Sequence, residues 1–197
     1  SLHLERLYPY LARSPVAQRA ISRQFFGRDL AQAAHPGFGH GLRWQGASAL
    51  RRLFAPSSRT TIDPVRRLLE DLPEAFPRWT PLAQDQYLEI RTLLSGYLLS
   101  SQGDRMLMAN SVEGRFPFLD KNVVDLAASL PDSYKLHVLD EKHVLKRAAR
   151  GLLPRSIVDR KKQPYRAPDA LAFIGGPLPA AVEDAPSGAS VRNAGVF

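Results

Sequence analysis

Two sets of charged residues in the second half of the chain have types and positions that could do chemistry. The first is Glu113, which stands among apolar side chains in the stretch GDRMLMANSVEGRFPFLD, residues 103–120. A carboxylate in such a setting is unfavourable unless a cation or a substrate lies beside it. The second is the basic triplet Arg160, Lys161 and Lys162. Three adjacent cations are compact enough to bind one phosphate chain, so the triplet favours a polyanionic partner.

Helical spacing predicts a short helix over residues 103–113, with Glu113 in its last turn. Apolar residues occupy nearly every face of this helix, so we expect it to be buried. Met106, Asn110 and Glu113 share one stripe, which predicts that the carboxylate points the same way as the buried stripe. Its charge also opposes the helix dipole at this end. Gly114 is predicted to take the left-handed C-cap position.

A second helix is predicted directly after this turn. Pro117 keeps residues 115–119 extended, and Asp120 has the side chain of an N-cap. Apolar residues then repeat at helical spacing until Pro131 stops the helix. The unit is therefore a buried helix, a sharp turn and a second helix.

The rest of the chain also has helical patterns, and no stretch alternates with a period of two, so we expect no sheet within these residues. The longest helix is predicted from Thr80–Pro81 to residue 99. The apolar faces of helices 80–99 and 103–113 are expected to pack on a sheet contributed by residues outside this chain. Further helices are predicted within 1–33, over 44–54, from the Asp63 cap through 72, from the Asp140 cap to Gly151, and from Pro154 to the basic triplet.

Residues 35–41, HPGFGHG, are predicted to form a surface loop because of their glycine density. The glycines do not match GxGxxG and follow no strand, which disfavours a phosphate site. His35 and His40 have no HExxH spacing and no nearby carboxylate, which disfavours a metal site.

Two separated motifs carry a resemblance to a known family. DRMLMANSVEGRFPFLD follows SGYLLSSQG, and LLPRSIVDRKKQPYRAP comes later in the chain. In this order they resemble the C-terminal half of the synthetase domain of glutamine-hydrolysing asparagine synthetases, most clearly over residues 80–175. The resemblance implies an α/β adenine nucleotide α-hydrolase-like domain, the PP-loop ATP pyrophosphatase fold. This chain would be its mainly α C-terminal portion, residues 1–175, followed by a flexible tail, residues 176–197.

The resemblance also implies a reaction and its site residues. In that family ATP adenylates the side-chain carboxylate of aspartate, and ammonia from glutamine displaces AMP to give asparagine. By position in the motifs, Glu113 and Lys162 are the implied catalytic residues, at the adenylation site and the α-phosphate. Lys161 is the implied phosphate-binding neighbour, and only the alignment of residues 163–165 with the family motif separates the two lysines.

The implied cofactors are ATP and Mg²⁺, but several of the family's motifs are absent from this sequence. These are the phosphate loop SGGLDS, the acidic motif for Mg²⁺ and the Cys nucleophile of the glutaminase domain. We therefore interpret the chain as a segment of a larger cytoplasmic protein, inactive alone, whose partners are an N-terminal glutaminase domain and the PP-loop half. The sequence leaves open whether the protein forms a homodimer. No run of 18 apolar residues predicts a membrane span.

Simpler interpretations of the two site residues stay open. Glu113 could be salt-bridged to Arg115, and Lys162 could be a solvated lysine at a helix end. Relatives that close a β-lactam or macrocyclic lactam tend to have tyrosine at the position of Glu113, so the glutamate favours amidation by ammonia. An amidotransferase or a lactam-forming ligase that acts on another carboxylic acid remains an alternative.

A second class of function follows from the net charge of +8, which arises from 27 Lys and Arg against 19 Asp and Glu. Such a charge is compatible with a basic helical module that binds nucleic acid or another polyanion. Outside the triplet, however, the basic pairs are scattered, as is typical of solvated faces. No motif interleaves aromatic and basic residues, which disfavours a nucleic-acid partner.

Overall fold

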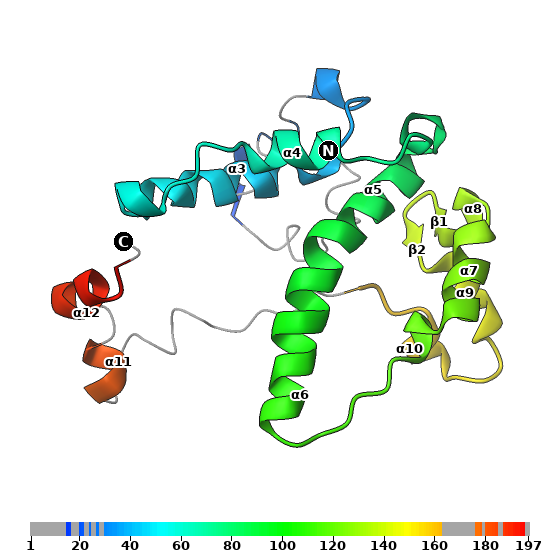
Figure 1. Cartoon of the computed structure of the whole chain (residues 1–197). Helices are drawn as coiled ribbons and strands as arrows, with labels where there is room; N and C mark the ends of the chain where they lie inside the picture. The colour runs from blue at the N-terminus through cyan, green and yellow to red at the C-terminus, as the bar shows by residue number, and fades with distance from the viewer. Residues whose placement is uncertain are drawn as a thin grey trace. The chain divides into compact units, whose positions relative to one another are not determined.

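The computed structural model describes residues 30–162 together with 15–16, 20–21, 24, 27, 176–178, 180–184 and 187–195. The described residues are mostly helical, which confirms the mainly α prediction (Figure 1). The chain divides into two compact units, one of residues 1–37 and 78–163 and the other of residues 38–77 and 164–197. Most of the two helices predicted within residues 1–33 lies outside the described residues.

The second unit contains the helices α3 (Gly41–Leu50) and α4 (Pro64–Glu70). A 3₁₀ turn at Arg51–Leu53 extends α3, so the helix predicted over residues 44–54 is confirmed with an earlier start. The predicted start of α4 at Asp63 and Pro64 is confirmed, and the helix ends at Glu70 rather than at residue 72. The Asp63 carboxylate accepts hydrogen bonds from the main-chain N–H groups of residues 65 and 66, at 2.9 and 3.3 Å, and Pro64 occupies the first turn.

The C-terminal stretch of the second unit contains two short helices, α11 (Ala180–Asp184) and α12 (Gly188–Asn193). The Ser187 side chain accepts a hydrogen bond from the N–H of Ser190 and so caps α12. The predicted tail, residues 176–197, thus contains regular structure, and its mobility stays a prediction.

The first unit is built around one continuous helical rod. It starts as α5 (Pro81–Glu89), continues through a π-helical stretch (Ile90–Asp104) and finishes as α6 (Arg105–Ala109). The Thr80 hydroxyl accepts from the N–H of Ala83 at 3.3 Å, which confirms the predicted start. The two helices predicted at 80–99 and 103–113 are therefore joined. In the wider π turns the hydrogen bonds join residues five apart, and the helix continues through the region where we predicted a break.

The end of this rod differs from the prediction, because the helix stops at Ala109 and not at residue 113. Ser111 takes the left-handed conformation, with φ 54°. Its N–H donates to the carbonyl of Met108 at 3.2 Å, while the N–H of Val112 donates to the carbonyl of Leu107 at 2.9 Å. This pair of bonds is a Schellman motif, which satisfies carbonyls at the helix end.

Gly114 therefore does not have the predicted role of C-cap. A Cβ atom at this position would lie 2.5 Å from Cδ1 of Leu107 and 2.9 Å from the Phe116 ring. Any larger residue here would displace the ends of these two side chains, so glycine lets the loop pass close to them.

The second helix of the predicted unit is confirmed as α7 (Lys121–Ser129). The Asp120 carboxylate accepts hydrogen bonds from the N–H groups of residues 122 and 123, at 2.9 and 3.4 Å. Contrary to the prediction, residues 115–119 are not extended throughout, because Pro117–Leu119 forms a 3₁₀ turn before the helix. The helix ends just before Pro131.

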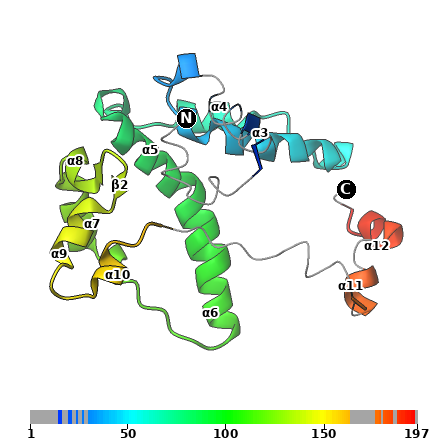
Figure 2. The same cartoon turned by 180° about the vertical axis from the view of Figure 1, so that it is seen from behind.

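A small antiparallel hairpin follows α8 (Asp132–Lys135), where no sheet was predicted. Its strands are β1 (Leu136–His137) and β2 (Asp140–Glu141), with Leu136 opposite Glu141 and His137 opposite Asp140. Strands of two residues are too short for an alternating pattern to be visible in the sequence. The hairpin leads into α9 (His143–Ala148) and α10 (Arg155–Val158). Figures 1 and 2 show these elements gathered beside the rod.

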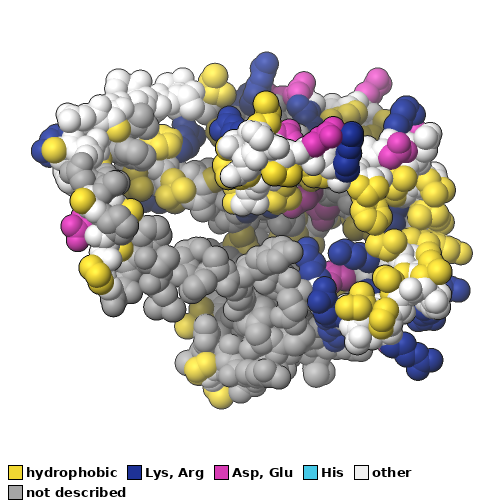
Figure 3. Space-filling model, turned by 90° about the horizontal axis from the view of Figure 1, so that it is seen from below, with side chains coloured by type: hydrophobic (Ala, Val, Ile, Leu, Met, Phe, Trp, Pro, Cys, Tyr) yellow, Lys and Arg dark blue, Asp and Glu magenta, His cyan; other side chains and the backbone are white. Residues whose placement is uncertain are grey.

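Few apolar side chains of the described part of the chain are buried. Phe76, Leu88 and Val158 are buried, whereas Met106 and Met108 are 55% and 79% exposed. The predicted burial of the 103–113 segment is therefore wrong for this chain by itself. Figure 3 shows hydrophobic side chains at the surface over the part that holds α7 to α10. None of the helices in the described ranges is long and apolar enough to cross a membrane.

These exposed apolar faces lead to a prediction for the segment expressed alone. We expect it to bind a hydrophobic dye and to aggregate, because contiguous apolar surface of this kind is a liability when no partner covers it. Dye fluorescence and light scattering would measure both effects. A cooperatively melting monomer without dye binding would contradict this expectation.

Candidate functional site

Glu113 lies in the loop between α6 and α7, not in a helix. Its carboxylate forms an ion pair with Arg115, Oε1 to Nη2 at 2.8 Å, and the two side chains are 74% and 81% exposed. The predicted helical and buried setting is wrong because the Schellman motif ends the helix before this residue is reached. The simpler interpretation of Glu113, an ion pair with Arg115, is present in the structure. An ion pair this exposed holds its partners weakly, so the carboxylate is accessible to a substrate.

The basic triplet also lies outside a helix. α10 ends at Val158, so Lys161 and Lys162 follow it in a segment without regular structure rather than in its last turn. The main-chain N–H of Lys162 donates to Oε1 of Glu141 at 3.1 Å. This bond attaches the segment to strand β2 and leaves the exposed ammonium end of Lys162 uninvolved in the attachment. The family-motif residues 163–165, which select Lys162 over Lys161, lie outside the described residues.

A cavity of about 270 Å³ is lined by residues of both the hairpin and the basic segment. Lys161 lines it, whereas Glu113 does not. Both positively and negatively charged side chains line the cavity, so its surface is polar. The complete lining among described residues is His137, Val138, Leu139, Asp140, Glu141, Lys146, Asp159 and Lys161.

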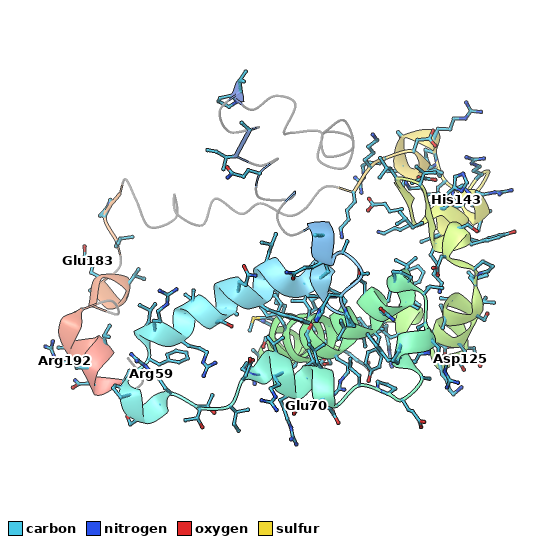
Figure 4. The ribbon with its side chains drawn as sticks, turned by 90° about the horizontal axis from the view of Figure 1, so that it is seen from above. Arg59, Glu70, Asp125, His143, Glu183 and Arg192 are labelled. Carbon is cyan, nitrogen blue, oxygen red and sulfur yellow. The ribbon has the colours of Figure 1, made fainter. Side chains whose placement is uncertain are left out.

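Asp140 is the centre of a cluster at one side of this cavity. Its carboxylate accepts hydrogen bonds from Nζ of Lys146 and from Nδ1 of His143, each at 2.7 Å. The ring of His137 stacks on that of His143, with centroids 4.8 Å apart. The hydrogen bond from Lys146 and then that from His143 hold the pKa of Asp140 below its usual value of 3.8. Figure 4 labels His143 on α9.

The sequence prediction for Asp140 was wrong, because it was expected to cap the following helix. The N-cap is instead Lys142, in the left-handed conformation with φ 56°. His143 and Lys146 lie three apart and therefore on one side of α9, facing Asp140 in strand β2. A carboxylate shortly before a histidine and a lysine at this spacing was the available signal.

We expect Asp140→Asn to lower the melting temperature at neutral pH. A carboxyl whose folded pKa is depressed stabilises the fold above its unfolded pKa, near 3.8, and loses this contribution as pH falls through the lower folded value. The side chain is 44% exposed, so solvent screening limits the effect to on the order of 1 kcal/mol. Thermal unfolding of the full-length protein at several pH values measures it. The difference between the two proteins should shrink as the pH falls below 3.8.

Asp125→Asn is the matched control for this prediction. Asp125, which Figure 4 labels, forms an ion pair with Lys121 on α7. Their side chains are 60% and 84% exposed. Loss of this ion pair should have a smaller effect because both partners are more exposed. Equal melting temperatures for Asp140→Asn and the unmodified protein at neutral pH would show that the cluster does not stabilise the fold.

A metal site is not found in the part of the chain that the structure describes, where no three His, Asp or Glu side chains are grouped to hold an ion. His40, predicted to lie in a surface loop, is instead buried, with 5% exposure. Its ring stacks on Trp44, with centroids 5.4 Å apart, and its Nδ1 lies 2.7 Å from Nη2 of Arg43. His40 is therefore a core residue of the second unit.

Comparison with known proteins identifies the family. Residues 5–197 match the asparagine synthase family, so the chain belongs to it, and the resemblance given by the two motifs is confirmed. The chain is 42% identical over 83 residues to a glutamine-hydrolysing asparagine synthetase of Bacillus subtilis, a match that covers 42% of this chain and 13% of that protein.

Two further relatives differ in their described activities. A putative glutamine-hydrolysing asparagine synthetase of Mycobacterium bovis is 36% identical over 90 residues, 46% of this chain and 14% of that protein. An amidase of Gibberella zeae is 29% identical over 124 residues, 60% of this chain and 18% of that protein. The matches thus span less than a fifth of each relative's length. No solved structure matches the chain.

Proposed function

We propose that this chain is the helical C-terminal portion of the synthetase domain of a glutamine-dependent asparagine synthetase. In this reaction the β-carboxylate of aspartate attacks the α-phosphorus of ATP and pyrophosphate leaves. Ammonia derived from glutamine then attacks the acyl carbon of the β-aspartyl-adenylate, AMP leaves, and the nitrogen loses a proton to give asparagine. The observation that carries the proposal is the family match along almost the whole chain.

Lys162 and Lys161 would bind and neutralise the phosphate groups. Two anions, a carboxylate and a triphosphate, must meet in the first step, so a fixed cation at the developing charge is the main help a protein can give. The attachment of the Lys162 main chain to Glu141 supports this role, because it restrains the backbone and leaves the ammonium group available. Lys161 lines the adjoining cavity and would contact the same phosphates.

Glu113 would act near the reacting carboxyl group of aspartate. Its exposed position in a loop supports this role, because a substrate group can approach the carboxylate directly. Arg115 beside it keeps a cation near the carboxylate when no substrate is bound.

The remaining parts of the site would come from the rest of the protein. Among the described residues no three His, Asp or Glu side chains are grouped to hold a metal ion. We propose that residues outside this chain supply the PP-loop half of the α/β domain, the ligands for Mg²⁺ and the glutaminase domain. Residues 1–175 would form the helical portion and residues 176–197 the tail. Asparagine biosynthesis of this kind would take place in the cytoplasm.

Isotope exchange between ATP and pyrophosphate in the full-length protein tests the proposal. We expect exchange that requires aspartate, and formation of asparagine and AMP when glutamine is added. The similarity to an amidase makes a second acid a specific alternative. Exchange that another carboxylic acid supports and aspartate does not would identify a related amidotransferase. Salt-sensitive binding of unrelated oligonucleotides, without any exchange, would favour the polyanion-binding class.

A further inference from the structure

One hydrogen bond joins two segments that are far apart in the sequence and that both border the cavity. Oε1 of Glu141 accepts from the main-chain N–H of Lys162 at 3.1 Å, across 21 positions of sequence. Glu141 belongs to strand β2, and Lys162 belongs to the segment that follows α10. The bond therefore restrains the position of a segment that has no regular structure of its own.

The acceptor side of this bond is itself anchored. Strand β2 pairs with β1, and Asp140, the neighbour of Glu141, binds His143 and Lys146 on α9. The stack of His137 on His143 ties β1 to the same helix. A continuous set of contacts therefore leads from α9 through the hairpin to the main chain of Lys162.

Such a restraint matters because a lysine ammonium group lies at the end of a flexible four-carbon stem. The side chain cannot hold a fixed position unless its main chain does. A displacement of about 1 Å in a catalytic group can reduce a rate by about a hundredfold.

We propose that Glu141 is a positioning residue, whose carboxylate holds the main chain of Lys162 so that Lys161 and Lys162 face one anionic substrate. The inference rests on the function proposed above for the two lysines. It requires an oxygen acceptor at residue 141 and does not require its negative charge. Glu141→Gln keeps an oxygen acceptor and Glu141→Ala removes it, so this pair of variants separates the two properties.

Two measurements on the full-length protein test this role. The first is the rate of tryptic cleavage after Arg160, Lys161 and Lys162, which reports on the main chain and does not depend on activity. We expect faster cleavage in Glu141→Ala and cleavage at the unmodified rate in Glu141→Gln. The second is aspartate-dependent exchange, for which we expect kcat to fall about tenfold or more in Glu141→Ala with the KM for aspartate unchanged. Glu141→Gln should restore most of the kcat.

Glu70→Ala is the control, because Glu70 forms an exposed ion pair with Arg66 on α4 in the other unit. It should change neither measurement. Unchanged cleavage in Glu141→Ala would overturn the inference. A Glu141→Gln variant that is protected from trypsin but as slow as Glu141→Ala would also overturn it, because Glu141 would then act through its charge. If the unmodified protein shows no aspartate-dependent exchange, the proposed function fails, and the cleavage rates still decide whether Glu141 holds this segment.

Discussion

Lys162→Ala in the full-length protein is expected to lower aspartate-dependent ATP–pyrophosphate exchange by a factor on the order of a hundred or more. Removal of one group that stabilises developing charge typically costs about 3 kcal/mol in the transition state. The local structure should survive the change. The bond between this position and Glu141 uses the main-chain N–H, which alanine keeps. A slow variant with an unchanged melting temperature would therefore report on the ammonium group itself.

Two other lysines make the experiment specific. Lys161→Ala is expected to raise the KM for ATP more than it lowers kcat, because Lys161 is proposed to bind phosphate without acting on the reacting phosphorus. Lys121→Ala removes an exposed lysine that pairs with Asp125 on α7 and should leave exchange unchanged. Isotope exchange at the unmodified rate in Lys162→Ala would show that Lys162 has no part in the mechanism. A larger loss of kcat in Lys161→Ala than in Lys162→Ala would assign the α-phosphate role to Lys161 and phosphate binding to Lys162.

Glu113→Gln is expected to reduce the same exchange, also by on the order of a hundredfold. The substitution keeps the size of the side chain and removes its charge and its capacity to accept a proton. It also breaks the ion pair with Arg115, but both side chains are more than two-thirds exposed. Loss of such a pair changes stability by about 1 kcal/mol or less. A large loss of exchange activity would therefore be too large to come from the loss of the ion pair alone.

Arg115→Gln separates these two effects because it breaks the same ion pair and keeps the Glu113 carboxylate. We expect Arg115→Gln to retain most of the exchange activity and to melt at a temperature close to that of Glu113→Gln. Equal losses of activity in the two variants would show that the ion pair, and not the carboxylate, is what the reaction needs.

Local sequence signals predicted the starts of several helices. Asp63 and Asp120 were predicted as N-caps and Thr80–Pro81 as the start of a helix. The side chains of Asp63, Thr80 and Asp120 each accept hydrogen bonds from the first turn of the helix that follows. A cap involves residues two or three positions apart, so the residues alone carry the information. The two motifs likewise predicted the family, which the comparison confirms.

The end of the rod shows where local signals were insufficient. Gly114 was the obvious C-cap by residue type, yet Ser111 takes the left-handed conformation. At Gly114 the loop instead passes close to Leu107 and the Phe116 ring. This choice removed Glu113 from the helix and placed it in an exposed loop.

The amino-acid sequence by itself determined which residue types the candidate site has, in which order they occur and where most of its helices begin. Only the tertiary structure decided how these residues are held. It attached the main chain of Lys162, in the segment that follows α10, to Glu141 in the hairpin. The physical reason is the range of the interactions. Caps form between near neighbours, whereas the Glu141–Lys162 bond joins positions 21 residues apart and exists only after α9, the hairpin and α10 have come together.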